Sequence, residues 1–302
     1  MKVALTGAKG LIGSALTERM IASGFEVIRM TRDKSDRKNP VWNPDSGSMD
    51  EKSREKLEGL HAFIHLAGEN IASGRWTKDK KEEIQQSRVQ ATSNLVEALS
   101  ALNAPPPNFL CASAIGYYGN RGEETLTERS SVAKADFLSS LCRDWEKSAN
   151  SIKEVFPETR VVNLRFGVVL STKGGALKTM LPPFQMGLGG PIGTGHQYMS
   201  WIDIEDVAAA IIHCLNHSEI NGPVNIVSPN PASNAVFTKT LSDVIKKPAF
   251  LPMPAFAAKM VFGQMGEELL LSSAKVRPAK LEETGFKFDF PTLHNSLQHL
   301  LS

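Results

Sequence analysis

Short apolar runs alternate with segments of helical periodicity along the first half of the chain. The apolar runs that we interpret as strands are residues 3–6, 25–30, 61–68, 108–113 and 160–166. The segments in which apolar residues recur at helical spacing are 11–23, 77–102 and 133–155. This alternation predicts parallel β-α-β units, and therefore an α/β fold of the Rossmann type, a doubly wound parallel sheet with helices on both faces. Such a sheet binds ligands at the carboxyl ends of its strands.

The alternation stops after residue 166. A Gly/Pro-rich stretch follows, then a short strand that leads into a helix at 200–215, and a further strand at 223–229. We interpret 1–228 as a nucleotide-binding domain, with 166–201 contributing to the substrate cleft. Residues 229–302 contain short helical patterns and several prolines, and we expect them to form a small α+β lobe on the substrate side.

Three glycines follow the first strand at three-residue spacing. Gly7 allows a tight turn, Gly10 lets backbone N–H groups approach a pyrophosphate, and Gly13 lets the helix pack against the strand. The N-terminus of that helix favours negative charge. No Lys-Ser/Thr pair follows the glycines, so an ATP-type P-loop does not fit. The motif predicts a dinucleotide site, and the alternative is a glycine-rich turn without a ligand.

The end of the second strand bears on the choice between NAD and NADP. An acidic residue at this tip would bind the ribose 2′-hydroxyl of NAD, whereas an arginine suits the 2′-phosphate of NADP. Thr31 and Arg32 occupy the tip, and Asp33 follows them. We therefore favour NADP(H). The alternatives are NAD and an Arg32 that is an ordinary solvated cation.

The composition limits which partners and which cellular compartment we expect for this protein. The chain has 302 residues, of which 41% are hydrophobic, and a formal net charge of +2. Its Lys and Arg residues are dispersed, so we expect no nucleic-acid partner. The three cysteines form no C-x-x-C pair, which disfavours disulfides and zinc. No run of eighteen apolar residues is present, so we expect no membrane partner and a cytoplasmic protein.

Several longer motifs are similar to those of extended short-chain dehydrogenases/reductases. They are the glycine motif at 7–13, "HLAGENI" (65–71), "SAIGYYG" (113–119) and "SWIDIEDVAAA" (200–210). More narrowly, the chain resembles atypical proteins of the NAD-dependent epimerase family that end in a small tail domain. The motifs "GENIASGRW", "SRVQATSNLVEAL" and "KVRPAKLEETGFKF" carry this narrower resemblance, which covers the whole chain.

The resemblance implies a set of cofactor contacts. It places Leu66 and Ala67 beside the adenine and ribose, Glu83 and Arg88 near the cofactor, and Val169 at the nicotinamide end. Glu83 and Arg88 are equally compatible with a solvated helix face. The complete set of candidate cofactor residues is Gly7, Gly10, Leu11, Ile12, Gly13, Thr31, Arg32, Leu66, Ala67, Glu83, Arg88 and Val169.

The usual catalytic residues of the superfamily are only partly present. Its ordinary members use a Ser, a Tyr and a Lys four residues beyond that Tyr. Ser113 fills the Ser position, but alignment places Leu138 and Cys142 at the Tyr and Lys positions. Ser113 is therefore a candidate to bind the reacting oxygen. Tyr118, in the turn that follows, is a candidate proton donor, with packing as the alternative.

Other polar residues are compatible with either a chemical or a structural role. We favour packing over nucleophilic chemistry for Cys142. His196 could donate a proton or bind an anionic substrate in a loop over the cleft, or it could cap a turn. The acidic residues at 203–206 are predicted to begin a helix rather than to bind metal. For Arg277, only its charge argues for a substrate contact.

The sequence thus favours an NADP-dependent oxidoreductase, or an epimerase-like enzyme, that acts on a small carbonyl or hydroxyl substrate. The alternative is a regulator or sensor that binds NADP(H) without turnover, which the missing Tyr and Lys favour. The long helices at 77–102 and 133–155 are compatible with a homodimer.

Overall fold

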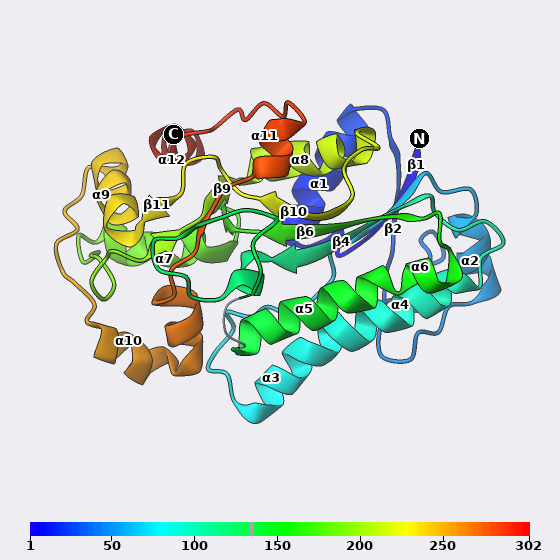
Figure 1. Cartoon of the computed structure of the whole chain (residues 1–302), viewed down its shortest axis with the longest axis horizontal. Helices are drawn as coiled ribbons and strands as arrows, with labels where there is room; N and C mark the ends of the chain where they lie inside the picture. The colour runs from blue at the N-terminus through cyan, green and yellow to red at the C-terminus, as the bar shows by residue number, and fades with distance from the viewer. Residues whose placement is uncertain (133–135) are drawn as a thin grey trace.

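A six-stranded parallel sheet forms the centre of the computed structural model, which describes residues 1–132 and 136–302 (Figure 1). The strand order is β10-β6-β4-β3-β1-β2. The strand bounds are β1 Lys2–Thr6, β2 Glu26–Arg29, β3 Ala62–His65, β4 Asn108–Ala114, β6 Arg160–Phe166 and β10 Gly222–Ile226. The order reverses between β1 and β3, so the predicted doubly wound topology is confirmed.

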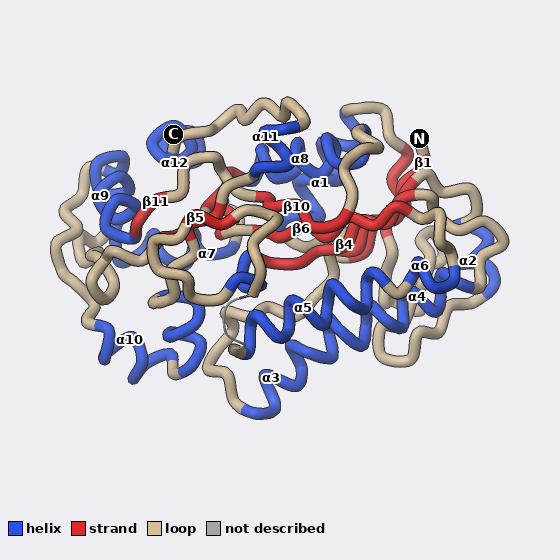
Figure 2. The backbone as a smooth tube through the Cα atoms, in the orientation of Figure 1, coloured by secondary structure: helices blue, strands red, loops and turns tan. Residues whose placement is uncertain are grey.

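Helices cover both faces of this sheet, as Figure 2 shows. The helices α1 (Leu11–Ala22) and α8 (Ile204–Asn216) pack together on one face, and α4 (Ala91–Ser100) and α5 (Phe137–Asn150) pack together on the other. The central strands are buried on both sides and therefore consist mainly of apolar residues. A polar residue inside one of them is consequently unusual.

The C-terminal lobe lies beyond the carboxyl edge of the sheet. In it α7 (Gly175–Gln185), which comes from before residue 229, packs with α9 (Asn234–Ile245) and α12 (Leu293–Leu301) around the buried Trp201 and Phe237. Three two-stranded ladders join distant segments: β7–β9, β8–β11 and β5–β12. Their bounds are β5 Thr125–Leu126, β7 Val168–Leu170, β8 Tyr198–Met199, β9 Trp201–Asp203, β11 Ala232–Ser233 and β12 Lys275–Val276.

The remaining elements are short. They are α2 (Glu51–Leu57), α3 (Lys78–Gln85), the π-helical turn η1 (Gln86–Gln90), the 3₁₀ turn η2 (Ile115–Tyr118), α6 (Ile152–Val155), α10 (Ala255–Phe262), η3 (Gly266–Leu270) and α11 (Ala279–Glu283).

The two long predicted helices are divided in the structure. The helix expected at 77–102 consists of α3 and α4 with η1 between them, and a π turn of this kind is often found at a functional site. The helix expected at 133–155 consists of α5 and α6, and residues 133–135 lie outside the described residues. Within the described part of the chain, no helix combines the length and the apolarity that crossing a bilayer requires.

Candidate functional site

A crevice opens at the carboxyl ends of β3, β4 and β6, at the position where sheets of this topology bind ligands. It is lined mainly by apolar side chains, with Arg88, Ser113 and Cys142 as its polar members. The lining residues are Ile12, Leu66, Gly68, Ile71, Arg88, Ala112, Ser113, Ala114, Leu138, Leu141, Cys142, Trp145 and Phe166. Four of the predicted site residues therefore meet here: Ile12, Leu66, Arg88 and Ser113.

The glycine loop is packed too closely for side chains. Gly7 has a φ of +71°, and a Cβ there would lie 2.8 Å from the carbonyl carbon of Leu66. A Cβ on Gly13 would lie 2.1 Å from the carbonyl oxygen of Gly7. Gly10 begins α1 without a side-chain cap, so the N–H groups of the first turn have no side-chain acceptor. This open helix start suits an anion, and the loop fits a pyrophosphate.

A buried Thr-His pair holds the Leu66–Ala67 turn. The Thr6 hydroxyl accepts hydrogen bonds from the backbone N–H groups of Leu66 (3.2 Å) and Ala67 (3.4 Å), and it lies 2.6 Å from Nδ1 of His65. His65 is completely buried, and burial lowers its pKa to about 4. The imidazole is therefore neutral at pH 7, and the two backbone segments that flank the crevice are tied together.

This pair predicts an acid sensitivity. The pKa of His65 rises to about 6.5 on unfolding, so its contribution to stability is complete above pH 6.5 and is lost as the pH falls towards 4. Between pH 7 and pH 5 we expect His65 to account for about 2 kcal/mol of lost stability. Urea unfolding at both pH values, compared with His65→Gln, measures the difference. An equal loss in the variant would contradict the assignment.

The tip of β2 presents unpaired positive charge. Arg32 is exposed and, within the described part of the chain, has neither an ion pair nor a hydrogen bond from its side chain. The carboxylate of Asp33 instead accepts hydrogen bonds from the side chain and backbone of Ser35, which lower its pKa. The Lys9 ammonium of the glycine loop also lowers the pKa of Asp33, by a smaller amount.

Arg88 and Glu83 have different environments. Arg88 is half-buried on η1, donates a hydrogen bond to the carbonyl oxygen of Glu69 (2.8 Å), and stacks over Trp145. No carboxylate within the described residues forms an ion pair with it. Glu83 is 56% exposed on α3, is paired with Lys80 at 3.0 Å, and does not line the crevice. Its contact with a cofactor stays a prediction.

The remaining candidate cofactor residues lie around the glycine loop. Gly175 brings Leu11 and Val169 close together, since a Cβ at this glycine would lie 3.2 Å from a Leu11 methyl group and 3.6 Å from the carbonyl oxygen of Val169. Thr31 is half-buried, and its hydroxyl accepts the backbone N–H of Asp33. The cofactor contacts of these residues stay predictions.

Ser113 belongs to a buried ionic network. Its hydroxyl donates to Oε1 of Glu146 on α5 at 2.7 Å. Arg165 on β6 binds both oxygens of the same carboxylate, at 2.7 and 2.8 Å. Burial alone would lower the pKa of Arg165, but the Glu146 carboxylate raises it, so the guanidinium is charged. The carboxylate can only accept here, and the Ser113 hydrogen therefore points to Glu146.

The structure does not support Tyr118 as a proton donor. Its side chain is fully buried, its hydroxyl donates to Asn225 (2.7 Å) and accepts from Arg165 (3.0 Å), and it does not line the crevice. Burial raises its pKa to about 12. The geometry favours the alternative, that Tyr118 is a packing residue, because its hydroxyl both donates and accepts a hydrogen bond inside the protein. The guanidinium carbon of Arg165 lies 3.5 Å from the ring centre of Tyr117.

Leu138 and Cys142, which the family resemblance aligns with the usual Tyr and Lys, line the crevice from α5. Burial raises the pKa of the Cys142 thiol to about 12, so the thiolate form is scarce at neutral pH. All three cysteines are free and buried. Packing, rather than nucleophilic chemistry, therefore accounts for Cys142.

The other polar candidates have structural contacts outside the crevice. His196 is exposed, and Arg277 forms an ion pair with Glu282 at 2.6 Å. Asp203 caps α8, and Asp206 accepts two backbone N–H groups from the segment after α11. The described residues contain no cluster of His, Cys, Asp or Glu suited to a metal ion.

Lys9, Glu146 and Arg165 were not among the site residues predicted from the sequence. A charged residue inside the apolar strand "RVVNLRF" was the available signal for Arg165, since a charge in a strand covered on both faces needs a buried partner. Strands β4 and β6 pair Ser113 directly with Arg165, which follows from the strand order and not from either segment alone.

Comparisons with known proteins agree with this geometry. Residues 3–227 match the NAD dependent epimerase/dehydratase family, and residues 253–300 match a domain of unknown function. Over 296 residues the chain is 38% identical to "Epimerase family protein MT2273" of Mycobacterium tuberculosis, with 98% of this chain and 96% of that protein covered. It is 35% identical to human "Epimerase family protein SDR39U1", with both chains fully covered.

Solved structures extend the comparison. The crystal structure of human SDR39U1 with NADPH has a TM-score of 0.90 and 34% identity, and 99% of each chain is covered. Thermus thermophilus UDP-glucose 4-epimerase in complex with NAD has a TM-score of 0.76, and 99% of each chain is covered. The latter is only 18% identical and demonstrates the shared fold alone.

Proposed function

Because the chain belongs to the NAD dependent epimerase/dehydratase family, we propose that it is an NADP(H)-dependent oxidoreductase or epimerase-like enzyme for a small hydroxyl or carbonyl compound. The observation that carries the cofactor assignment is Arg32, which is exposed after β2 and has no ion pair among the described residues, together with the uncapped start of α1 after the glycine loop. The chemistry rests on Ser113 in the crevice.

The residues of this chain fit NADP(H). Gly7 and Gly13 allow the close backbone packing of the loop, and Gly10 precedes the uncapped start of α1, where the pyrophosphate would bind. Arg32 offers a planar fork that can form two hydrogen bonds to a 2′-phosphate, and Lys9 adds a second positive charge. The human relative crystallised with NADPH supports the same choice. When bound, the nicotinamide would supply or accept hydride in the crevice.

The network behind Ser113 defines what its hydroxyl can do. Its hydrogen is directed to Glu146, so the lone pairs of Oγ are what the serine can offer to the crevice. We infer that Ser113 accepts a hydrogen bond from a substrate hydroxyl group. The guanidinium of Arg165 holds Glu146 in place, and Glu146 is a positioning residue for the serine.

The lining of the crevice bears on the substrate. Leu66, Ile71, Leu138 and Phe166 provide apolar contact, and Arg88 is the charged member of the lining. A small and largely apolar substrate with one hydroxyl or carbonyl group suits such a surface. Binding and orientation would then account for most of the rate, because Leu138 cannot transfer a proton.

A regulator that binds NADP(H) without turnover is the second candidate. The observation that favours it is the absence, among the described residues lining the crevice, of an acid-base side chain at the Tyr position, where Leu138 lies. Tight coenzyme binding without oxidation of NADPH across a broad substrate panel is the expected behaviour of such a protein.

The enzyme hypothesis predicts different effects for two substitutions. With NADP+ and a panel of primary and secondary alcohols, whose hydroxyl group can donate to Ser113, we expect Ser113→Ala to lower kcat/KM by about tenfold or more, because one hydrogen bond in the crevice is lost. Tyr118→Phe should leave kcat nearly unchanged and lower the melting temperature, because its hydroxyl is bound inside the protein. Unchanged turnover in Ser113→Ala would contradict the proposed role.

A further inference from the structure

The C-terminal lobe exposes an apolar surface that nothing in the proposed chemistry uses. We propose that this surface, which we term the apolar edge, binds the surface of an anionic phospholipid bilayer. Six large apolar side chains define it, each between 56% and 71% exposed: Met186, Leu188, Phe250, Phe256, Met260 and Val261. Soluble monomers seldom expose so many large apolar side chains in one region without a partner.

Backbone contacts join the two segments of the apolar edge. The Leu251 N–H donates to the Gly189 carbonyl at 3.1 Å, and the Met253 N–H donates to the Pro191 carbonyl at 2.9 Å. The Pro248 ring also lies against Gly187. The turn after α7 and the connection from α9 to α10 are therefore side by side, and Figure 1 shows α9, this connection and α10 along one edge of the molecule.

Helix α10 has distinct inner and outer sides. Ala258 is fully buried, and Phe262 packs against the cluster that contains Leu138. Phe256 and Met260 are four residues apart, so they share the opposite, solvent-facing side of the helix. The helix is thus fixed to the protein by one side and leaves an apolar side without a partner.

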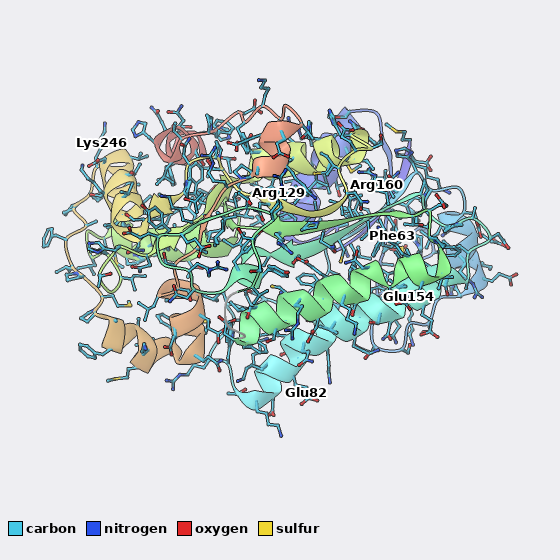
Figure 3. All side chains as sticks on the ribbon, in the orientation of Figure 1. Phe63, Glu82, Arg129, Glu154, Arg160 and Lys246 are labelled. Atoms are coloured by element: carbon cyan, nitrogen blue, oxygen red, sulfur yellow. The ribbon has the colours of Figure 1, made fainter. Side chains whose placement is uncertain are left out.

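The charges around the apolar edge point to an anionic partner. Neither 186–197 nor 244–266 contains an Asp or a Glu, whereas Lys246, Lys247 and Lys259 lie in the second segment. Lys259 is paired with Glu267, but Lys246 and Lys247 form no ion pair within the described residues. Figure 3 shows Lys246 at the tip of α9, on the same edge as α10. Lysines beside exposed aromatic side chains are typical of proteins that bind the bilayer interface.

A bilayer fits this surface better than a second copy does. A two-fold interface would bring the same patch of both copies together, and with it their uncompensated lysines. Neither the crevice nor the pocket beside Asn230 and Thr292 lies on the apolar edge. The expectation of no membrane partner rested on the lack of a spanning segment, which does not bear on binding at the interface.

Vesicle binding tests the proposal and is independent of the coenzyme or of turnover. We expect the full chain to cosediment with phosphatidylcholine vesicles that contain phosphatidylglycerol, and much less with phosphatidylcholine alone. Phe250→Ser/Phe256→Ser and Lys246→Glu/Lys247→Glu should each weaken binding by about tenfold or more. Ile21→Ser, an equally drastic change at a 52% exposed position on α1, is the control and should bind like the wild type.

Three results would overturn the proposal. They are no binding to anionic vesicles, binding that both double variants retain, and a dimer in analytical ultracentrifugation that Phe250→Ser/Phe256→Ser dissociates. The last result would assign the apolar edge to a second copy. Circular dichroism melting curves establish that each variant is folded, so that a loss of binding reports on the surface.

Discussion

Replacement of Arg32 by Ala is expected to weaken NADPH binding by about 10- to 100-fold, because it removes hydrogen bonds between a charged donor and a phosphate. The affinity for NADH should change by much less, because NADH lacks the 2′-phosphate. Arg32 is exposed after β2 and has no partner among the residues that the structure describes, so its removal leaves none of them buried without a partner. Fluorescence titration with both coenzymes measures the two affinities.

Lys9→Ala provides a second test of the same tip. We expect this variant to lose less affinity for NADPH than Arg32→Ala does, since a lysine contributes a point charge rather than the two hydrogen bonds of a planar guanidinium. Lys34→Ala, a nearby exposed lysine after the tip, is the matched control and should have little effect. Equal losses for NADH and NADPH in Arg32→Ala would contradict the assignment of the 2′-phosphate to this residue.

Glu146→Ala is expected to lower the free energy of unfolding by about 3–5 kcal/mol, because it leaves the buried guanidinium of Arg165 without its carboxylate. At roughly 2–4 °C per kcal/mol, the melting temperature should fall by at least about 6 °C. Side-chain exposures of 3% for Arg165 and 10% for Glu146 distinguish this pair from the surface ion pairs of the chain.

Two further variants separate this effect from a general loss of packing. Asp243→Ala removes the exposed pair with Lys239 and should cost less than about 1 kcal/mol. Glu146→Met combined with Arg165→Met removes both charges and should be more stable than Glu146→Ala alone. A melting temperature of Glu146→Ala close to that of the wild type would show that Arg165 does not depend on this carboxylate.

The central fold could be predicted from the sequence because its signals are local. The six sheet strands and α1 appear as apolar runs and helical periodicity in consecutive residues, and the glycine motif fixes the first β-α turn. The family resemblance stated from the motifs is confirmed by the match over residues 3–227. The NADPH-bound human relative agrees with the coenzyme that Arg32 indicated.

Most of the features that could not be predicted from the sequence depend on contacts between distant segments, and one is a local turn without a distinctive pattern. The ladder of β7 and β9 pairs two segments of three residues each, which is too short for a pattern to reveal. The π turn at Arg88 has nearly the same apolar spacing as an α-helix, so periodicity could not detect it. The contact of Ser113 with Glu146 and Arg165 requires the strand order and the position of α5.

Tyr118 illustrates a related difficulty. A tyrosine in a glycine-flanked turn after Ser113 has the expected chemistry and the expected position in the sequence. The Tyr118 side chain points into the protein because its hydroxyl is hydrogen-bonded to Asn225 on β10 and to Arg165 on β6. The residue type therefore suggested a proton donor, whereas the packing of two other strands provides a structural explanation for the same side chain.

The most direct test of the central claim is isothermal titration calorimetry of the wild-type protein with NADPH and, in parallel, with NADH. We predict that each chain binds one NADPH. Because of the 2′-phosphate contacts, its affinity for NADPH should be at least about tenfold higher than its affinity for NADH. A titration that detects no binding of either coenzyme, or that finds NADH bound as tightly as NADPH, would contradict the account.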